Sequence, residues 1–197
     1  FREAEKLAKE LVRENPRDVN AALLLARLAI KARCFKDAQE LLERIIELAP
    51  GFIAARHDLG TVLKETHKHE DAVDVLREAV GIDEDNALSH YYLGAALAMA
   101  AKPREAADSY QRAVELDPLL PGGHIGLGHV LKTVGNQSAG IDAYKRAIEL
   151  RPNYGETYYS LANLKTFRFS KDEIASMESR LENENLPTEC RVHFAFA

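Results

Sequence analysis

The sequence has few cysteines, no long apolar run and no excess of basic charge, and each absence excludes a class of protein. Two cysteines, Cys34 and Cys190, are too few for a disulfide framework, which favours a reducing, cytoplasmic compartment. No stretch approaches the roughly 18 apolar residues that a membrane span requires, so we expect no membrane partner. The 31 acidic residues outnumber the 26 Lys and Arg, giving a net charge of −5. This acidity argues against a nucleic-acid partner.

The overall composition is that of a folded, water-exposed protein. Of 197 residues, 46% are hydrophobic and 29% are charged, which suits one large domain or two small ones. The first residue is Phe1 rather than Met, so we expect a fragment of a longer chain, with a removed signal peptide as the alternative.

The sequence is built from an internal repeat with a 34-residue period. Five leucines recur in phase with it, each followed by a small residue: Leu25-Ala26, Leu59-Gly60, Leu93-Gly94, Leu127-Gly128 and Leu161-Ala162. Prolines keep the same period at Pro16, Pro50, Pro118 and Pro152, and Glu84 stands at the remaining position. Over nearly its full length the chain therefore resembles the tetratricopeptide repeat (TPR) family, whose repeat has this length and this pattern of large and small side chains.

The physical pattern within each period agrees with that resemblance. Two segments carry apolar residues at helical spacing, and the small residue after each leucine lets two antiparallel helices approach closely. The recurring proline ends the second helix, because it lacks an N–H donor. We predict an all-α fold, a right-handed TPR superhelix (α-solenoid) of antiparallel helix pairs. The predicted helices span 2–14, 18–32, 36–48, 53–66, 70–82, 87–100, 104–116, 121–134, 138–150, 155–168 and 171–184.

The chain divides into four regions in this interpretation. They are the second helix of a truncated repeat (1–16), four TPR repeats (17–154), a degenerate last repeat or cap (155–188) and the start of a truncated helix (189–197). In the degenerate repeat, Ser170 and Glu173 form a capping box for one more helix. Lys165 stands where earlier repeats have Ala or Leu, and Ile174 replaces the small residue. A solenoid cap explains these departures, because its outer face meets water.

A second resemblance concerns the C-terminal part of the chain, residues 155–169 together with Arg191, Val192, His193 and Phe194. They are similar to the junction between repeats and enzyme in bacterial TPR sulfotransferases, whose catalytic domain uses the sulfate donor PAPS. The resemblance implies a substrate-recruiting arm, with Phe194 and Phe196 as core residues exposed by truncation. No Gly-rich phosphate-binding loop follows a strand in the sequence, so the catalytic domain itself would be absent.

Neither a catalytic site nor a metal or cofactor site is predicted, and we expect the chain not to be an enzyme. His90 and His124 stand one repeat period apart, at a repeat position where large side chains pack on the preceding repeat. His67 and His69 lie in one turn, but a structural zinc site needs four ligands. Cys34 lies beside two basic residues, but the repeat geometry places no base to complete a catalytic triad.

Function is expected on the concave face that the first helices of the repeats line. Tyr and Met, which are enriched in recognition surfaces, stand in the middle of this face. Packing within the stack is the alternative for its two adjacent tyrosines. The predicted partner-binding residues are Arg27, His57, Asp58, Thr61, Lys64, Tyr91, Tyr92, Met99, Ile125, His129, Lys132, Tyr159 and Asn163.

Two TPR binding modes fit these positions poorly. Chaperone-tail clamps bind a carboxylate with Lys, Asn and Arg at inward positions, and in this chain those positions hold mostly other residues. The O-linked GlcNAc transferase array carries a ladder of asparagines along its groove, and in this chain only Asn163 matches it. An extended or helical peptide with apolar anchors fits better. We predict a protein- or peptide-binding scaffold. The recruiting arm of a PAPS-dependent sulfotransferase, and self-association through the truncated ends, are the alternatives.

Overall fold

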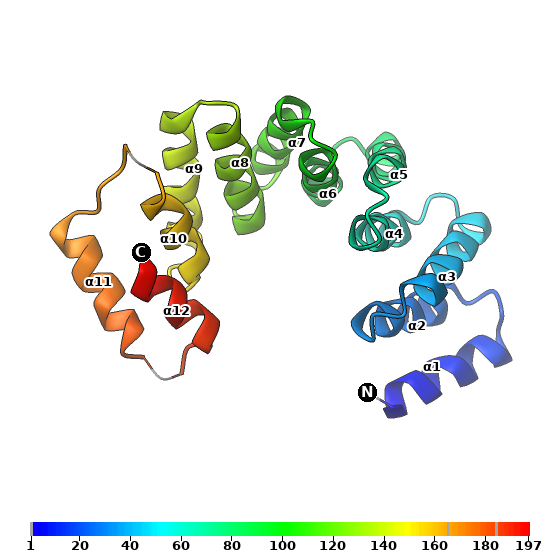
Figure 1. Cartoon of the computed structure of the whole chain (residues 1–197). Coiled ribbons are helices and arrows are strands. Elements are labelled where there is room, and N and C mark those ends of the chain that lie inside the picture. The colour runs from blue at the N-terminus through cyan, green and yellow to red at the C-terminus, as the bar shows by residue number, and fades with distance from the viewer. Residues whose placement is uncertain (1, 165, 184) are drawn as a thin grey trace. The chain divides into compact units, whose positions relative to one another are not determined.

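The computed structural model describes residues 2–164, 166–183 and 185–197, and the regular structure in these ranges is helical (Figure 1). The predicted helices are confirmed with one exception, the helix that begins at Gly155. The helices are α1 (Arg2–Glu14), α2 (Val19–Lys31), α3 (Phe35–Leu48), α4 (Ile53–Glu65), α5 (His69–Ile82), α6 (Ala87–Met99), α7 (Pro103–Leu116), α8 (Pro121–Thr133), α9 (Gln137–Leu150), α10 (Gly155–Ala162), α11 (Lys171–Leu181) and α12 (Thr188–Phe196).

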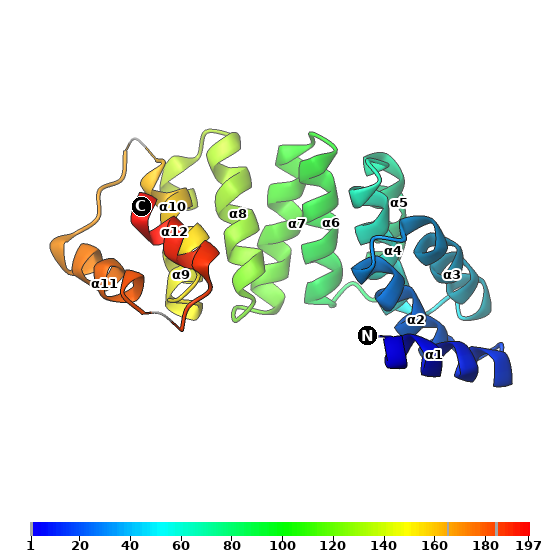
Figure 2. The ribbon, with the colours of Figure 1, turned by 60° about the horizontal axis from the view of Figure 1, so that its bottom comes forward.

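The chain forms two compact units, residues 1–102 and 103–197. In the first unit, α2 packs against α3 and α4 against α5, and Figure 2 shows α4 and α5 side by side. The first helices α2, α4 and α6 also contact one another in sequence and so form one row. In the second unit, α8 packs against α9 and α7, and α10 against α9.

The turn between the two helices of a pair has the same backbone conformation in successive repeats. One residue per repeat, at the same repeat position, lies in the left-handed region: Arg33 (φ 60°), His67 (φ 61°), Ala101 (φ 56°) and Gly135 (φ 88°). At Gly135 this conformation costs little, because glycine has no Cβ. The other three residues carry a steric cost of about 1 kcal/mol each, which the packing of the flanking helices offsets.

The small residues after the repeat leucines allow the close helix contacts that the sequence predicts. A Cβ on Gly60 would lie 2.6 Å from Cδ1 of Leu76, and a Cβ on Gly128 would lie 2.7 Å from Cε1 of Tyr144. Each partner belongs to the second helix of the same pair. Leu59, Leu93, Leu127 and Leu161 are buried, whereas Leu25 is only half-buried and lines a cavity beside α1.

In four repeats a large side chain three positions before the repeat leucine ties its helix to the preceding turn. His90 donates from Nε2 to the carbonyl of Glu84 (2.9 Å), and His124 does so to the carbonyl of Pro118 (3.0 Å). Two other types of side chain make the same bond, from Arg56 to Pro50 and from Tyr158 to Pro152. These side chains are thus structural, although the bond back to the preceding turn was not predicted.

The last helix pair differs from the prediction. α10 ends at Ala162 rather than continuing to residue 168. Phe167 and Phe169 pack against the buried cluster of Tyr144, Leu161 and Leu164. Residues two apart lie on different faces of a helix, so both rings reach this cluster only because the helix has ended. The departure noted at Lys165 lies outside the described residues.

The capping box at the start of α11 is confirmed, but α11 does not take the usual place of a second helix. α12 lies against α10, and α11 lies against α12 (Figure 1). A Cβ on Gly155 would collide with the carbonyl oxygen of Cys190, so a larger residue there would separate α10 from α12. The expected exposure of Phe194 is wrong: the ring is 5% exposed and packs on Tyr158 at a centroid distance of 5.0 Å. Phe196 is exposed, as expected.

Candidate functional site: the first-helix faces

An ion pair joins α2 to α4 on the first-helix face of residues 1–102. Nε of Arg27 lies 2.6 Å from Oδ2 of Asp58, and the Arg27 side chain is 54% exposed. The two residues come from successive first helices, so the pair fixes their register on the face that we predicted to bind a partner. A charge-assisted bond of this geometry is stronger than a neutral one.

Aromatic rings join α4 to α6 on the same face. The His57 ring stacks on the Tyr92 ring with centroids 4.6 Å apart, and the Tyr91 and Tyr92 rings meet edge to face at 5.3 Å. Nε2 of His57 lies 2.9 Å from Oγ of Ser89. His57 is buried, so its main contribution is to the stack, while both tyrosines stay half-buried at the surface.

The electrostatics of this cluster keep the rings of His57 and Tyr92 neutral. Burial lowers the pKa of His57, against the opposing effect of Asp58. Burial raises the pKa of Tyr92, and so do Asp58 and Tyr91, while Arg27 lowers it. At neutral pH the face therefore has one ion pair next to the uncharged imidazole of His57 and the uncharged phenol of Tyr92.

The remaining predicted residues of this unit differ in how far their side chains are exposed and available to a partner. Thr61 is used within α4, where its hydroxyl donates to the carbonyl of His57 (3.0 Å). Lys64 is half-buried, and burial lowers the pKa of its ammonium group. Met99 is 56% exposed, and two further large apolar side chains in the same row of helices, Leu24 and Leu88, are also exposed.

In residues 103–197 a second ring pair joins His129 of the first helix α8 to Tyr144 of the second helix α9. Oη of Tyr144 lies 2.8 Å from Nδ1 of His129. Burial and the nearby Glu156 raise the pKa of Tyr144 to about 12, while burial lowers the pKa of His129. The phenol therefore donates to Nδ1 at neutral pH, and the imidazole proton is on Nε2.

The other predicted residues of this unit are spread over α8 and α10. Ile125 is half-buried and Lys132 is exposed on α8. The Tyr159 ring is exposed and lies 5.7 Å from the ring of His193. The amide of Asn163 donates to the carbonyl of Tyr159 (2.9 Å) and so bonds to the end of its own helix.

Two residues of these faces were missed by sequence reasoning. Ser89 bonds to His57. The sequence signal for it is weak: this repeat position holds Ala21, Ala55 and Gly123 in three repeats, but a second hydroxyl, Thr157, in the last. His193 reaches Tyr159 because α12 returns to α10, and no local pattern predicts that return.

The side chains considered for metal or thiol chemistry can be located in the residues that the structure describes. No group of three or more His, Cys, Asp and Glu side chains in the described ranges is arranged to hold a metal ion. The His67 and His69 rings meet edge to face at 5.8 Å, and Cys34 is exposed with its thiol 3.8 Å from the carbonyl of Ala32. Within the same ranges, no helix has the length and apolar character to cross a membrane.

Comparison with solved structures finds the same fold. MamA from Desulfovibrio magneticus RS-1 is 22% identical, with 77% of this chain and 85% of that chain covered and a TM-score of 0.67. TTC0263, a thermophilic TPR protein from Thermus thermophilus, is 21% identical over 78% and 84% of the two chains, with a TM-score of 0.69. YrrB, described as a TPR protein with an unusual peptide-binding site, is 18% identical over 97% and 93%, with a TM-score of 0.65. No curated protein matches the sequence.

Family models match the repeats themselves. Three models of the tetratricopeptide repeat match residues 1–63, 57–121 and 123–154. Together they span most of the chain. The regular sequence period, the helix pairs and these matches agree that the chain belongs to the tetratricopeptide-repeat family and has an all-α solenoid fold.

Proposed function

We propose that the chain is a protein-interaction module whose first-helix faces bind a peptide segment of a partner protein. The observation that carries this proposal is the exposure of three large apolar side chains, Leu24, Leu88 and Met99, on the first helices of residues 1–102. Exposed apolar side chains gathered on one surface mark interaction sites, because a protein gains nothing by keeping them in water.

The polar groups around these side chains support contact rather than catalysis. Arg27 is paired with Asp58, and His57 with Ser89, so these groups already have partners within the face. A rigid frame of this kind holds the neighbouring rings Tyr91 and Tyr92 in place. Rigid aromatic side chains lose little conformational entropy on binding and are enriched at interface centres.

The peptide that fits such a surface has apolar anchors at intervals. Side chains that alternate along an extended segment, or recur every three to four residues in a helix, reach successive first helices. Ile125, His129, Lys132, Tyr159 and Asn163 give residues 103–197 a face of mixed polarity for the same role. The peptide-binding site named for YrrB supports the proposal as an example of the function on this fold.

Peptides selected from a displayed random library against the whole chain would test the proposal. We expect the dissociation constant of a selected peptide, measured by fluorescence anisotropy, to rise at least about tenfold in Tyr91→Ala and in Met99→Ala, since truncating an interface anchor typically costs more than about 1 kcal/mol.

Matched controls exist on the second helices of the same unit. Leu48→Ala on α3 and Ile82→Ala on α5 remove apolar side chains of similar exposure, and we expect them to leave the affinity unchanged. Equal effects of the two sets of variants, with unchanged circular-dichroism melts, would refute the assignment to the first-helix face.

The alternatives from the sequence stay predictions. The family models match repeats alone, and nothing in the described residues favours the arm of a PAPS-dependent sulfotransferase. Self-association through the ends has Leu7, Leu11 and Phe196 as exposed apolar side chains on α1 and α12. Light scattering that gives a concentration-independent monomer mass would exclude it.

A further inference from the structure

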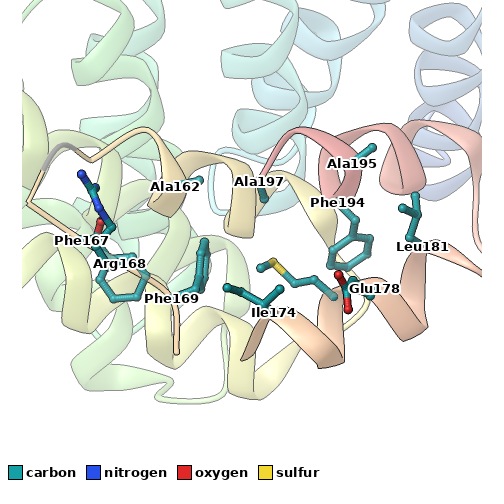
Figure 3. Close-up of a pocket in the computed structure, with 11 residues that line it drawn as sticks. Ala162, Phe167, Arg168, Phe169, Ile174, Glu178, Leu181, Phe194, Ala195 and Ala197 are labelled. Atoms are coloured by element: carbon teal, nitrogen blue, oxygen red, sulfur yellow. The ribbon is translucent and has the colours of Figure 1, made fainter. Parts of the chain in front are cut away.

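The C-terminal helices enclose a pocket that the proposed peptide-binding role does not use. Its volume is about 530 Å³, and it lies between α11, α12 and the segment that follows α10 (Figure 3). Figure 3 shows Phe169, Ile174 and Phe194 converging on it from these three elements. Pockets of this size commonly hold small organic ligands.

The pocket results from the unusual position of α11. This helix lies against α12 rather than forming an ordinary pair with α10, so one of its faces borders a space. Four residues of that face line the pocket at helical spacing: Ile174, Met177, Glu178 and Leu181. Three are apolar and the fourth is a carboxylate; Met177 is buried, whereas Ile174 and Glu178 are exposed, so this side of the pocket is open to solvent.

Glu178 is the charged residue of this stripe. In the part of the chain that the structure describes, its carboxylate has no ion pair or hydrogen bond. The neighbouring Arg180 is bonded to Ser176, and Arg168 donates to the carbonyl of Phe167 (2.7 Å). Glu178 is exposed at the edge of the apolar walls, where its carboxylate can pair with a positive charge on a ligand whose apolar part enters the pocket.

The aromatic walls favour the same charge. Phe167 and Phe169 stand edge to face with centroids 4.9 Å apart, which presents ring faces in perpendicular directions. Nζ of Lys145 already lies 5.4 Å from the centroid of Phe167, so a ring of this cluster accepts a cation in the folded chain. Ring faces attract ammonium groups through their negative quadrupole.

We infer that this pocket binds an organic cation, a substituted ammonium group on an apolar body. The ammonium group pairs with the Glu178 carboxylate, and the body lies among Phe169, Ile174 and Met177. Such a ligand is either a free amine or a lysine side chain flanked by apolar residues. The net charge of −5 on the chain favours its approach.

Calorimetric titration of the whole chain with 3-phenylpropylamine tests this inference at neutral pH. We expect saturable binding, and binding of the isosteric anion 3-phenylpropionate at least about tenfold weaker. Glu178→Gln should weaken the amine at least about tenfold, because it removes the charge while keeping the shape. Ile174→Ala, a change at a partly exposed wall, should weaken it severalfold.

Glu182→Gln is the matched control, since Glu182 lies one turn further on in exposed sequence and does not line the pocket. It should bind the amine as the unmodified chain does. A peptide with lysine between phenylalanine and leucine that competes with the amine would assign the site to a protein ligand, and its failure to compete would assign it to free amines. Equal binding of amine and anion, an unchanged affinity in Glu178→Gln, or the absence of amine binding would overturn the inference.

Discussion

Nε2 of His57 lies 2.9 Å from Oγ of Ser89, across the contact between α4 and α6, and both side chains are buried. The imidazole also stacks on Tyr92, so one side chain connects two first helices by a hydrogen bond and by ring contact. The geometry holds the face of residues 1–102 together and requires a neutral imidazole, because burial disfavours the charged form.

The stability of the fold should therefore fall in mild acid. His57 has its pKa lowered in the folded chain, so on acidification the unfolded chain takes up a proton first, from near pH 6.5 downward. The stabilisation is fully present above pH 6.5 and is lost as the pH falls toward the lower folded pKa. Urea unfolding at pH 7.5 and pH 5 measures the difference. In His57→Gln, which does not titrate, we expect a smaller fall, and an equal fall would contradict this account.

The bond from Tyr158 to the turn before its helix predicts a difference between adjacent tyrosines. Oη of Tyr158 donates to the carbonyl of Pro152 at 3.1 Å, and the ring is buried. Tyr158→Phe keeps the ring and removes the bond, so we expect a loss of about 0.5–1.5 kcal/mol of unfolding free energy. Tyr159→Phe, at an exposed ring, should change it by less than about 0.5 kcal/mol. Thermal and urea unfolding would show whether the two variants differ.

We expect glycine to be required for stability at Gly128, where two helices meet closely, and not at Gly81, which has open space around it. A Cβ on Gly128 meets the buried ring of Tyr144, whereas a Cβ on Gly81 meets nothing within 4 Å. We expect Gly128→Ala to lose about 1–3 kcal/mol through overpacking, even after the gain in helix propensity. Gly81→Ala, within α5, should gain about 0.5–1 kcal/mol. Stabilisation by both substitutions, measured by urea denaturation, would mean that α8 and α9 do not meet closely at Gly128.

The two phenylalanines of α12 give a direct test of the C-terminal packing. Phe194 is buried against Tyr158, while Phe196 is 73% exposed. Phe194→Ala should lose about 3–5 kcal/mol from the second unit, because it leaves a cavity between α10 and α12. Phe196→Ala should have almost no effect. Hydrogen exchange of the α10 amides is the measurement, and equal exchange rates in the two variants would show that α12 does not cover α10.

The repeated part of the fold was predictable because the same physical requirement recurs once in every repeat. Gly60 and Gly128 each lie against a side chain of the second helix, where a larger residue would not fit. This need for a small residue is visible in the sequence as the Ala or Gly that follows each repeat leucine. The left-handed turn residue also recurs once per repeat, but Gly135 is the only one of the four whose residue type indicates this conformation.

The C-terminal helices were less predictable because their arrangement depends on contacts distant in sequence. Helical spacing continues past Ala162, but α10 ends there, and Phe167 and Phe169 pack against a cluster that includes Tyr144 of another helix. The return of α12 buries Phe194 and brings His193 to Tyr159. In the candidate site, exposed Met99 was identified from its repeat position, whereas Ser89 was not, because its partner His57 lies on another helix.

The claim on which the functional account depends is that the first-helix face of residues 1–102 meets the ligand. Nuclear magnetic resonance of the isotope-labelled chain, titrated with a selected peptide, tests it most directly. The account predicts that the largest amide shift changes fall on α2, α4 and α6, around Arg27, Tyr91 and Met99. Changes concentrated on the outer faces of α3 and α5, with the first helices unaffected, would contradict it.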